Sequence, residues 1–308
     1  MDFKLSITYD FPLTKKSLLL KKYIMLTTAQ LETAYQQACE IELQAFKPGN
    51  VSIYSAGHGM TVEDFRRSAT VSSSALVNPA YSVGEKIFYA IKATREAVGC
   101  NTNLGIVLLC APLLTAAYQV KAGQTLRSAL THVLAQTTVA DADWAFKAIC
   151  LASPAGLGDT PQQDVKQQAA VTLTQAMGLA AERDRIALQY GTAFKDVFDF
   201  AILRYNRAFN CFFDRSWAAV SVYTALLCQY PDSHIMRKYG LQHNDWVREQ
   251  MMTVNHALTY ATRADLLKQL HQVDNDFKSK SINPGTTADL TVATLLVTFL
   301  DELLSEKC

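Results

Sequence analysis

The stretch Thr28–Ala45 has the sequence TAQLETAYQQACEIELQA, and its pattern recurs along most of the chain. Its apolar residues mostly recur every three or four positions, which places them along one broad face of an α-helix. These residues are Leu31, Tyr35, Ala38, Ile41 and Leu43. Thr28–Ala45 is therefore predicted to be an amphipathic helix that buries this face.

The same spacing predicts helices in other parts of the chain and almost no strand. The stretches are Thr61–Ala75, Thr172–Asp199, Asp214–Cys228, His243–Gln272 and Ala288–Leu304. Glycine and proline, which interrupt helices, account for only 13 and 8 of the 308 residues, and alternating apolar and polar runs are nearly absent. We therefore predict an all-α fold in which residues 25–308 form a single multi-helix domain.

Composition and charge exclude several classes of partner. The chain has 29 basic and 28 acidic residues and a net charge of +1, so nothing attracts it globally to nucleic acid or to an anionic membrane surface. The longest apolar stretch, Ile106–Tyr118, contains Pro112 and is too short to cross a hydrocarbon core about 30 Å thick. We expect a soluble, cytoplasmic protein.

The cysteines point to the same compartment. There are 7 of them, without a Cys-x-x-Cys pair or a Cys/His pair at zinc-ligand spacing. Most lie in apolar runs, as Cys150 and Cys228 do. The pattern favours buried free thiols in a reducing compartment.

Polar segments that contain glycine lie between the predicted helices, and the first of them is Phe46–Ser52. It follows a helix that carries Glu42, and Gly49 allows the backbone to bend and to approach a ligand closely. Lys47 is a candidate phosphate contact beside this bend, and Asn50 completes the candidate binding segment. The alternative is a helix-ending turn with a surface lysine.

Two further segments offer one histidine and two small polar side chains. Ser55–Thr61 places His58 between two glycines just before a helix start, where free amides suit an anion and an imidazole can move a proton. Gly99–Gly105 contains Asn101 and Thr102, which suit ribose or base contacts. The alternatives are an ordinary hydrogen-bonded loop histidine and ordinary helix caps.

The last segments, Asp232–Gly240 and Ile282–Leu290, combine charged groups with helix starts. The residues of interest in them are His234, Arg237, Lys238, Gly285 and Asp289. Two cations near a helix start and a carboxylate suit a metal–triphosphate, although the carboxylate can equally stabilise the helix dipole. Since such segments are hard to explain otherwise in so helical a chain, we expect residues 47–60, 99–105, 232–240 and 283–289 to form one cleft.

Taken in order, these segments resemble the triphosphoribosyl-dephospho-CoA synthase family, with a similarity that extends from about Glu40 to Leu290. The matching positions are Lys47-Pro48-Gly49, Met60, Asn101-Thr102, Gly105, Asp232-Ser233, Gly240, Pro284-Gly285 and Ala288-Asp289-Leu290. The chain departs from the family pattern at Gly59, Asn103, Leu104 and His234, where the family has Asp, His, Lys and Asn. It therefore resembles a divergent branch, similar to members associated with one-carbon coenzyme biosynthesis.

The resemblance implies an all-α transferase that moves the triphosphoribosyl group of ATP to a hydroxyl of 3'-dephospho-CoA and releases adenine. It also implies Mg²⁺, with ATP as a substrate. Nucleotide contacts are assigned to Lys47, Gly49, Asn50, Asn101, Thr102, Arg237, Lys238 and Gly285, catalytic roles to Glu42, His58, His234 and Asp289, and metal binding to Glu42 and Asp289. Within the nucleotide set, the cations are assigned to the phosphates and Asn101 with Thr102 to the ribose.

Two other functions stay open. Phosphoribosyl or related transfer to a methanopterin- or methanofuran-type precursor would account for the missing His-Lys pair. A nucleotide-binding protein without catalysis would account for the missing Asp and Lys, although the Lys-Pro-Gly and Ala-Asp-Leu segments argue against it. In every case the expected partners are small molecules, a nucleotide and a coenzyme precursor, and the sequence leaves open whether the chain forms a homodimer.

Residues 1–24 are predicted to be a poorly packed extension. They lack helical periodicity and a signal-peptide cleavage site, and Met25 lies just before a helix start. A chain that begins at Met25 should therefore keep its melting temperature, followed by circular dichroism during heating. A fall of many degrees would show instead that the extension is part of the core.

Overall fold

The structure is a computed structural model that describes residues 26–57, 59–153 and 165–306, so the predicted extension and His58 lie outside it. Within these ranges there are fourteen α-helices, one short π-helix and no β-strand, which confirms the predicted all-α fold. The helices are α2 (Thr28–Gln44), α3 (Val62–Leu76), α4 (Val83–Val98), α5 (Leu104–Gln119), α6 (Leu126–Ala135), α7 (Val139–Ala152), α8 (Leu173–Ala180), α9 (Arg185–Gly191), η1 (Asp196–Ala201), α10 (Ile202–Phe212), α11 (Arg215–Gln229), α12 (Ser233–Tyr239), α13 (Asn244–Ala257), α14 (Arg263–Ser279) and α15 (Gly285–Ser305).

Local side chains define where the early helices begin. Thr27 accepts a hydrogen bond from the backbone N–H of Gln30, whose side chain accepts one from the Thr27 N–H, and Thr61 and Asp64 form the same reciprocal pair at α3. Each such cap contributes about 1 kcal/mol to helix stability. The predicted starts of both helices are therefore confirmed to within one residue.

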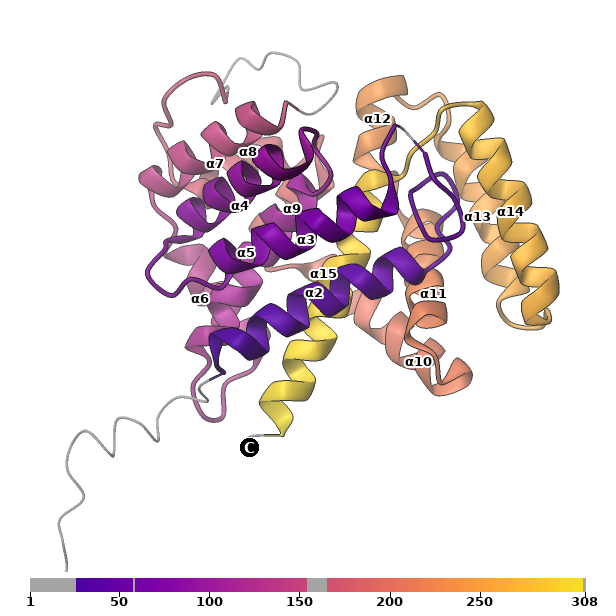
Figure 1. Ribbon diagram of the computed structural model, residues 1–308, viewed down its shortest axis with the longest axis horizontal. Helices are drawn as coiled ribbons and strands as arrows, with labels where there is room; N and C mark the ends of the chain where they lie inside the picture. Colours follow the sequence, from indigo (N-terminus) through magenta and orange to yellow (C-terminus); the bar gives the residue numbers. More distant parts are fainter. Residues whose placement is uncertain (1–25, 58, 154–164, 307–308) are drawn as a thin grey trace, which may run out of the picture.

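The last helix, α15, runs through the middle of the molecule (Figure 1). It contacts α2, α5 and α11, with α3 to α9 on one side and α10 to α13 on the other. Its central residues from Val292 to Val297 are all fully buried, as expected of a helix that is apolar on every side. One of them is a threonine, and Thr294 satisfies its buried hydroxyl by donating to the Leu290 carbonyl at 2.8 Å.

The predicted helix Thr172–Asp199 is wrong as a single element, because the structure divides it into α8, α9 and η1. Asp184 starts α9 by accepting from the backbone N–H groups of Ile186 and Ala187 at 2.9 and 3.1 Å. Ala193 and Phe194 then adopt φ angles of 49° and 57°, which no right-handed helix allows. Apolar periodicity does not detect such a reversal.

The predicted helix His243–Gln272 is likewise two helices, α13 and α14. The break precedes Thr262, whose hydroxyl caps α14 by accepting from the backbone N–H of Asp265 at 3.2 Å. The apolar spacing continues across the break, since each of the two helices buries an apolar face of its own. The sequence signal for the break is Thr262, a helix-capping residue within the apolar periodicity.

None of the helices in the described ranges has both the length and the apolar character needed to span a membrane. The six described cysteines are free, but only Cys39 and Cys110 are buried, while Cys150 and Cys211 are exposed. The prediction of buried thiols is therefore wrong for the exposed pair. An apolar run along a helix also includes positions on the solvent face, and Cys150 occupies one of them.

Helix α4 buries a lysine without an acidic partner in the described part of the chain. Lys86 is 3% exposed, and its ammonium donates to the carbonyl oxygen of Leu76, the last residue of α3, at 3.0 Å. Burial lowers the pKa of Lys86 to about 8 from its ordinary value of 10.5, because the charged form loses its hydration.

Replacing Lys86 by Met should raise the free energy of unfolding at neutral pH by about 2 kcal/mol, since desolvation of the charge costs more than its one hydrogen bond contributes. The cost is fully present below pH 8 and disappears as the pH rises towards 10.5, because the unfolded lysine binds more protons over that interval. Urea unfolding at neutral and alkaline pH measures the difference. A variant that is less stable at neutral pH would contradict this account.

Candidate functional site

The four polar segments meet at the start of α15. The Asn50 Nδ2 donates to Asn283 Oδ1 at 2.8 Å, which joins the first segment to the last. Asp232 Oδ2 accepts a hydrogen bond from the Thr287 N–H at 2.8 Å, which joins the third segment to the last. A Cβ at Gly105 would lie only 2.0 Å from Asp289 Oδ2, so the second segment also packs against α15. The described parts of these segments therefore converge, as expected.

Glu42 and Lys47 form a buried ion pair below this junction. The Lys47 Nζ lies 2.9 Å from Glu42 Oε1 and 2.5 Å from the Val51 carbonyl oxygen, and its side chain is 0% exposed. Burial raises the pKa of Glu42 and lowers that of Lys47, while the partner charges oppose both shifts. We expected Lys47 to contact a phosphate. In the structure its ammonium instead contacts two protein oxygens, so Lys47 holds Glu42 and the following loop in place.

The loop after Lys47 is held by α14 and by the chain before α15. Gly49 has a φ of +81°, its N–H donates to Asp274 Oδ1 at 2.8 Å, and a Cβ there would lie 2.8 Å from the Ile282 carbonyl oxygen. Asp274 Oδ2 also accepts from the Ser55 hydroxyl at 2.5 Å and pairs with the Lys278 Nζ at 3.0 Å. Only glycine satisfies both the angle and the space. The close approach predicted at Gly49 is thus made here by protein backbone.

Asp232, to which sequence analysis gave no role, ties α12 to α15. Its carboxylate is 3% exposed and accepts from the N–H groups of His234 and Ile235 at 2.8 and 3.2 Å, and from the Thr287 N–H and hydroxyl at 2.8 and 2.7 Å. A Cβ at Gly285 would lie 3.3 Å from His234 Nδ1, so two predicted site residues are neighbours. An Asp before Ser-His-Ile was a readable helix-cap signal.

The two predicted cations on α12 lie at an accessible edge. The Arg237 guanidinium pairs with the carboxylate of Asp184, and the two side chains are 29% and 24% exposed. Lys238 is exposed, with its Nζ 3.5 Å from the Ser281 carbonyl oxygen. Asp184 was missed by sequence analysis, because its pairing with α12 is a tertiary contact.

Asn101 and Thr102 each bond to the protein itself. The Asn101 Oδ1 accepts from the Leu104 N–H at 3.1 Å, at the start of α5, and the Thr102 hydroxyl lies 2.5 Å from the Ser68 hydroxyl. Asn101 therefore performs the capping role that was its alternative. Contacts of either side chain with a ribose stay a prediction.

Asp289 is the acidic group around which these side chains are arranged. It is partly buried, and it makes no hydrogen bond or ion pair with any described residue. Burial and the charges of Glu42 and Asp232 raise the pKa of Asp289 well above its ordinary value, while Arg237 opposes this shift. The described carboxylates that act on one another here, Glu42, Asp184, Asp232 and Asp289, outnumber the two cations, Lys47 and Arg237. The site is therefore short of positive charge.

A complete metal cage is not found among the described residues, where no group of three or more His, Cys, Asp or Glu side chains is close enough to hold an ion. A Mg²⁺ bound with a nucleotide needs less, since one or two carboxylates and phosphate oxygens suffice. Glu42 and Asp289 meet that smaller requirement in donor type, and a cation between them would relieve the excess of negative charge. Their assignment to Mg²⁺ stays a prediction.

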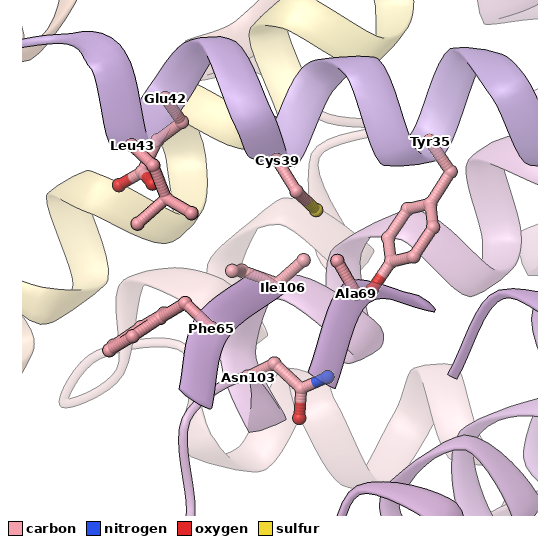
Figure 2. A pocket seen from close by; sticks show the side chains of 8 residues that line it. All are labelled: Tyr35, Cys39, Glu42, Leu43, Phe65, Ala69, Asn103 and Ile106. Atoms are coloured by element: carbon pink, nitrogen blue, oxygen red, sulfur yellow. The ribbon is translucent and has the colours of Figure 1, made fainter. Parts of the chain in front are cut away.

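A pocket opens beside this group of carboxylates, between α2, α3 and the start of α5 (Figure 2). Its lining residues are Tyr35, Cys39, Glu42, Leu43, Phe65, Ala69, Asn103 and Ile106. Glu42 belongs both to this lining and to the buried ion pair. The pocket is small, with a volume of about 10 Å³, which is roughly the room that one water molecule needs.

The packing of Asp289 on Gly105 is open to a direct test. Replacing Gly105 by Ala should lower the free energy of unfolding by about 1 to 3 kcal/mol, because the added Cβ would lie 2.0 Å from Asp289 Oδ2 and 2.6 Å from Ile186 Cδ1. In the matched control, Gly178→Ala in α8 meets nothing within 4 Å and should stabilise by about 0.5 to 1 kcal/mol. Equal effects in urea unfolding would contradict the close contact.

Comparison with known proteins identifies the family of the chain. A family model described as CitG: ATP:dephospho-CoA triphosphoribosyl transferase matches residues 28–308. No curated protein sequence matches the chain.

Among solved structures, the chain is similar to a protein from Archaeoglobus fulgidus described as a candidate triphosphoribosyl-dephospho-CoA synthase. The two are 20% identical with a TM-score of 0.57, over 75% of this chain and 95% of that one, which supports a shared fold. Since the family model covers nearly the whole sequence, this chain belongs to the CitG family of ATP:dephospho-CoA triphosphoribosyl transferases.

Proposed function

We propose that this protein transfers the triphosphoribosyl group of ATP to a hydroxyl of 3'-dephospho-CoA in the cytoplasm, and that the reaction takes place beside Asp289. Family membership supports the class of reaction. The observation that carries the location is a carboxylate without a partner among the described residues, at the point where four polar segments meet. An unpaired acid with like charges around it is typical of a functional site.

The reaction breaks the bond between the ribose C1 and adenine and forms a bond between C1 and the acceptor oxygen. The hydroxyl loses a proton, and the departing adenine gains one. As the base leaves, positive charge develops on the ribose, and nearby carboxylates stabilise it. Asp289, in its ionised form, would accept the hydroxyl proton, and Glu42 would add negative charge on the same side. His58 and His234 are the candidate proton donors to adenine.

The triphosphate brings several negative charges to a site that is already acidic. Mg²⁺, when bound, would neutralise part of this charge and orient the phosphates. We propose that Asp289 and Glu42 hold it, with Lys47 fixing the carboxylate of Glu42 from the buried side. Arg237 and Lys238 are accessible to the outer phosphates. The positive charges of Arg237 and Lys238 add to that of Mg²⁺, so all three would favour binding of the triphosphate.

Replacing Asp289 by Asn should reduce adenine release by at least about 100-fold, because the variant can neither bind the metal as an anion nor accept a proton. Its melting temperature should stay unchanged or rise, since the substitution removes a repelled charge. Adenine is measured by chromatography after incubation with ATP, Mg²⁺ and 3'-dephospho-CoA. Normal adenine release by a folded variant would refute the assignment.

The matched control is Asp232→Asn. This carboxylate accepts four hydrogen bonds from α12 and α15, so the amide should lower the free energy of unfolding by about 1 to 3 kcal/mol. Asp289→Asn is therefore expected to lose activity without losing stability, whereas Asp232→Asn is expected to lose stability. If Asp289→Asn is the destabilised variant and still binds nucleotide, Asp289 is a structural acid. If wild-type protein releases no adenine with any acceptor, the proposed reaction itself is wrong.

A further inference from the structure

The last turn of α12, the end of α14 and the start of α15 lie together at one end of the molecule (Figure 1). Tyr239, the last residue of α12, joins two of them, because its hydroxyl lies 3.2 Å from the Lys280 carbonyl oxygen and 3.1 Å from that of Ser281. The ammonium of Lys238 lies 3.5 Å from the same Ser281 oxygen. Lys238 and Lys280 are both exposed, so two cations are brought to one accessible edge of the protein.

These two lysines have no acidic partner among the described residues. The other described cations around the site each pair with a carboxylate, and they are Lys47, Arg237 and Lys278. The ammonium groups of Lys238 and Lys280 lie instead over aromatic rings, 5.0 Å from the ring centre of Tyr239 and 5.3 Å from that of Trp246. A ring at an exposed position holds a cation only weakly and leaves its charge uncompensated. Both ammonium groups are therefore available to an anion.

The same edge lies next to the carboxylate at which the reaction is proposed. Arg237, the residue before Lys238, is close enough to Asp289 for its charge to oppose the rise in the pKa of that carboxyl. Asp289 also lies only about 6 Å along α15 from Gly285, its first residue, since each residue of an α-helix adds about 1.5 Å. A nucleotide with its ribose at Asp289 would extend its phosphates past Arg237 towards the two lysines.

We propose that Lys280, together with Lys238, binds the terminal phosphate of the donor and so determines that the donor carries three phosphates. This rests on the proposed function and specifies how its donor is selected. A terminal phosphate carries about two negative charges at neutral pH, and two ammonium groups neutralise them while donating hydrogen bonds to its oxygens. ADP would end at Arg237 and would lose both contacts.

The test measures the binding of ATP and of ADP by calorimetry, with Mg²⁺ and without an acceptor. Wild-type protein should bind ATP at least about 30-fold more tightly than ADP, since ADP lacks two charge-assisted contacts. The double variant Lys238→Gln with Lys280→Gln should bind ATP more weakly and reduce this preference to below about 5-fold. Lys280→Arg, which keeps the charge, should retain most of the preference.

The matched control is Lys147→Gln on α7. The Lys147 ammonium also lies over a tryptophan, 4.6 Å from the ring centre of Trp144, but α7 is at the other side of the molecule (Figure 1). The control removes the same charge as either single lysine variant and should leave both affinities unchanged. Since Lys147, Lys238 and Lys280 are all exposed, every variant is expected to fold, and its melting temperature checks this.

Two outcomes separate this inference from the proposed reaction. If the double variant keeps the full preference for ATP, or if Lys147→Gln loses as much of it, the assignment of the two lysines is overturned, while normal release of adenine leaves the reaction standing. Because binding is measured without turnover, a preference for ATP that depends on the two lysines supports the phosphate contact even if no adenine is released, which would refute the reaction alone. A wild-type protein that binds ATP and ADP equally would also overturn the assignment.

Discussion

A single buried carboxylate, that of Asp232, holds the first turns of α12 and α15 together, and the geometry of the site depends on it. Each of its oxygens accepts two hydrogen bonds, from His234 and Ile235 on one side and from Thr287 on the other. Burial opposes its charge, and the four donors stabilise it. Because α15 crosses the middle of the fold, this junction also fixes where Asp289 meets α5.

The second constraint is electrostatic. Backbone N–H groups at helix starts stabilise the charge of Asp232, and Arg237 pairs with Asp184. Lys47 pairs with Glu42. Asp289 is then the one carboxylate of this group that has no partner among the described residues. Such an arrangement is unfavourable without a ligand, as the raised pKa of Asp289 reflects. Binding of a cation with a triphosphate would relieve it, so the same repulsion that destabilises the free site would favour its substrate.

The chemistry proposed for the site depends on its carboxylates, because the pocket next to Glu42 is too small to hold a base. The carboxylates beside it carry charge suited to a developing cation on the ribose. The accessible Arg237 and Lys238 extend the site towards solvent.

The sequence by itself determined the helical class, the starts of several helices and the order of the polar segments, because periodicity, caps and glycine positions are local properties. It also singled out Asp289, Arg237 and Lys238, although it expected the two cations near a helix start and they lie in the last turn of α12. It could not show that Lys47 forms a buried ion pair with Glu42 or that Asp184 pairs with Arg237. Nor could it show that the backbone leaves the helical conformation at Ala193 and Phe194. Those features were decided by tertiary structure, because burial and the charges of distant segments, rather than residue type, settle which groups are paired and which are left for a ligand.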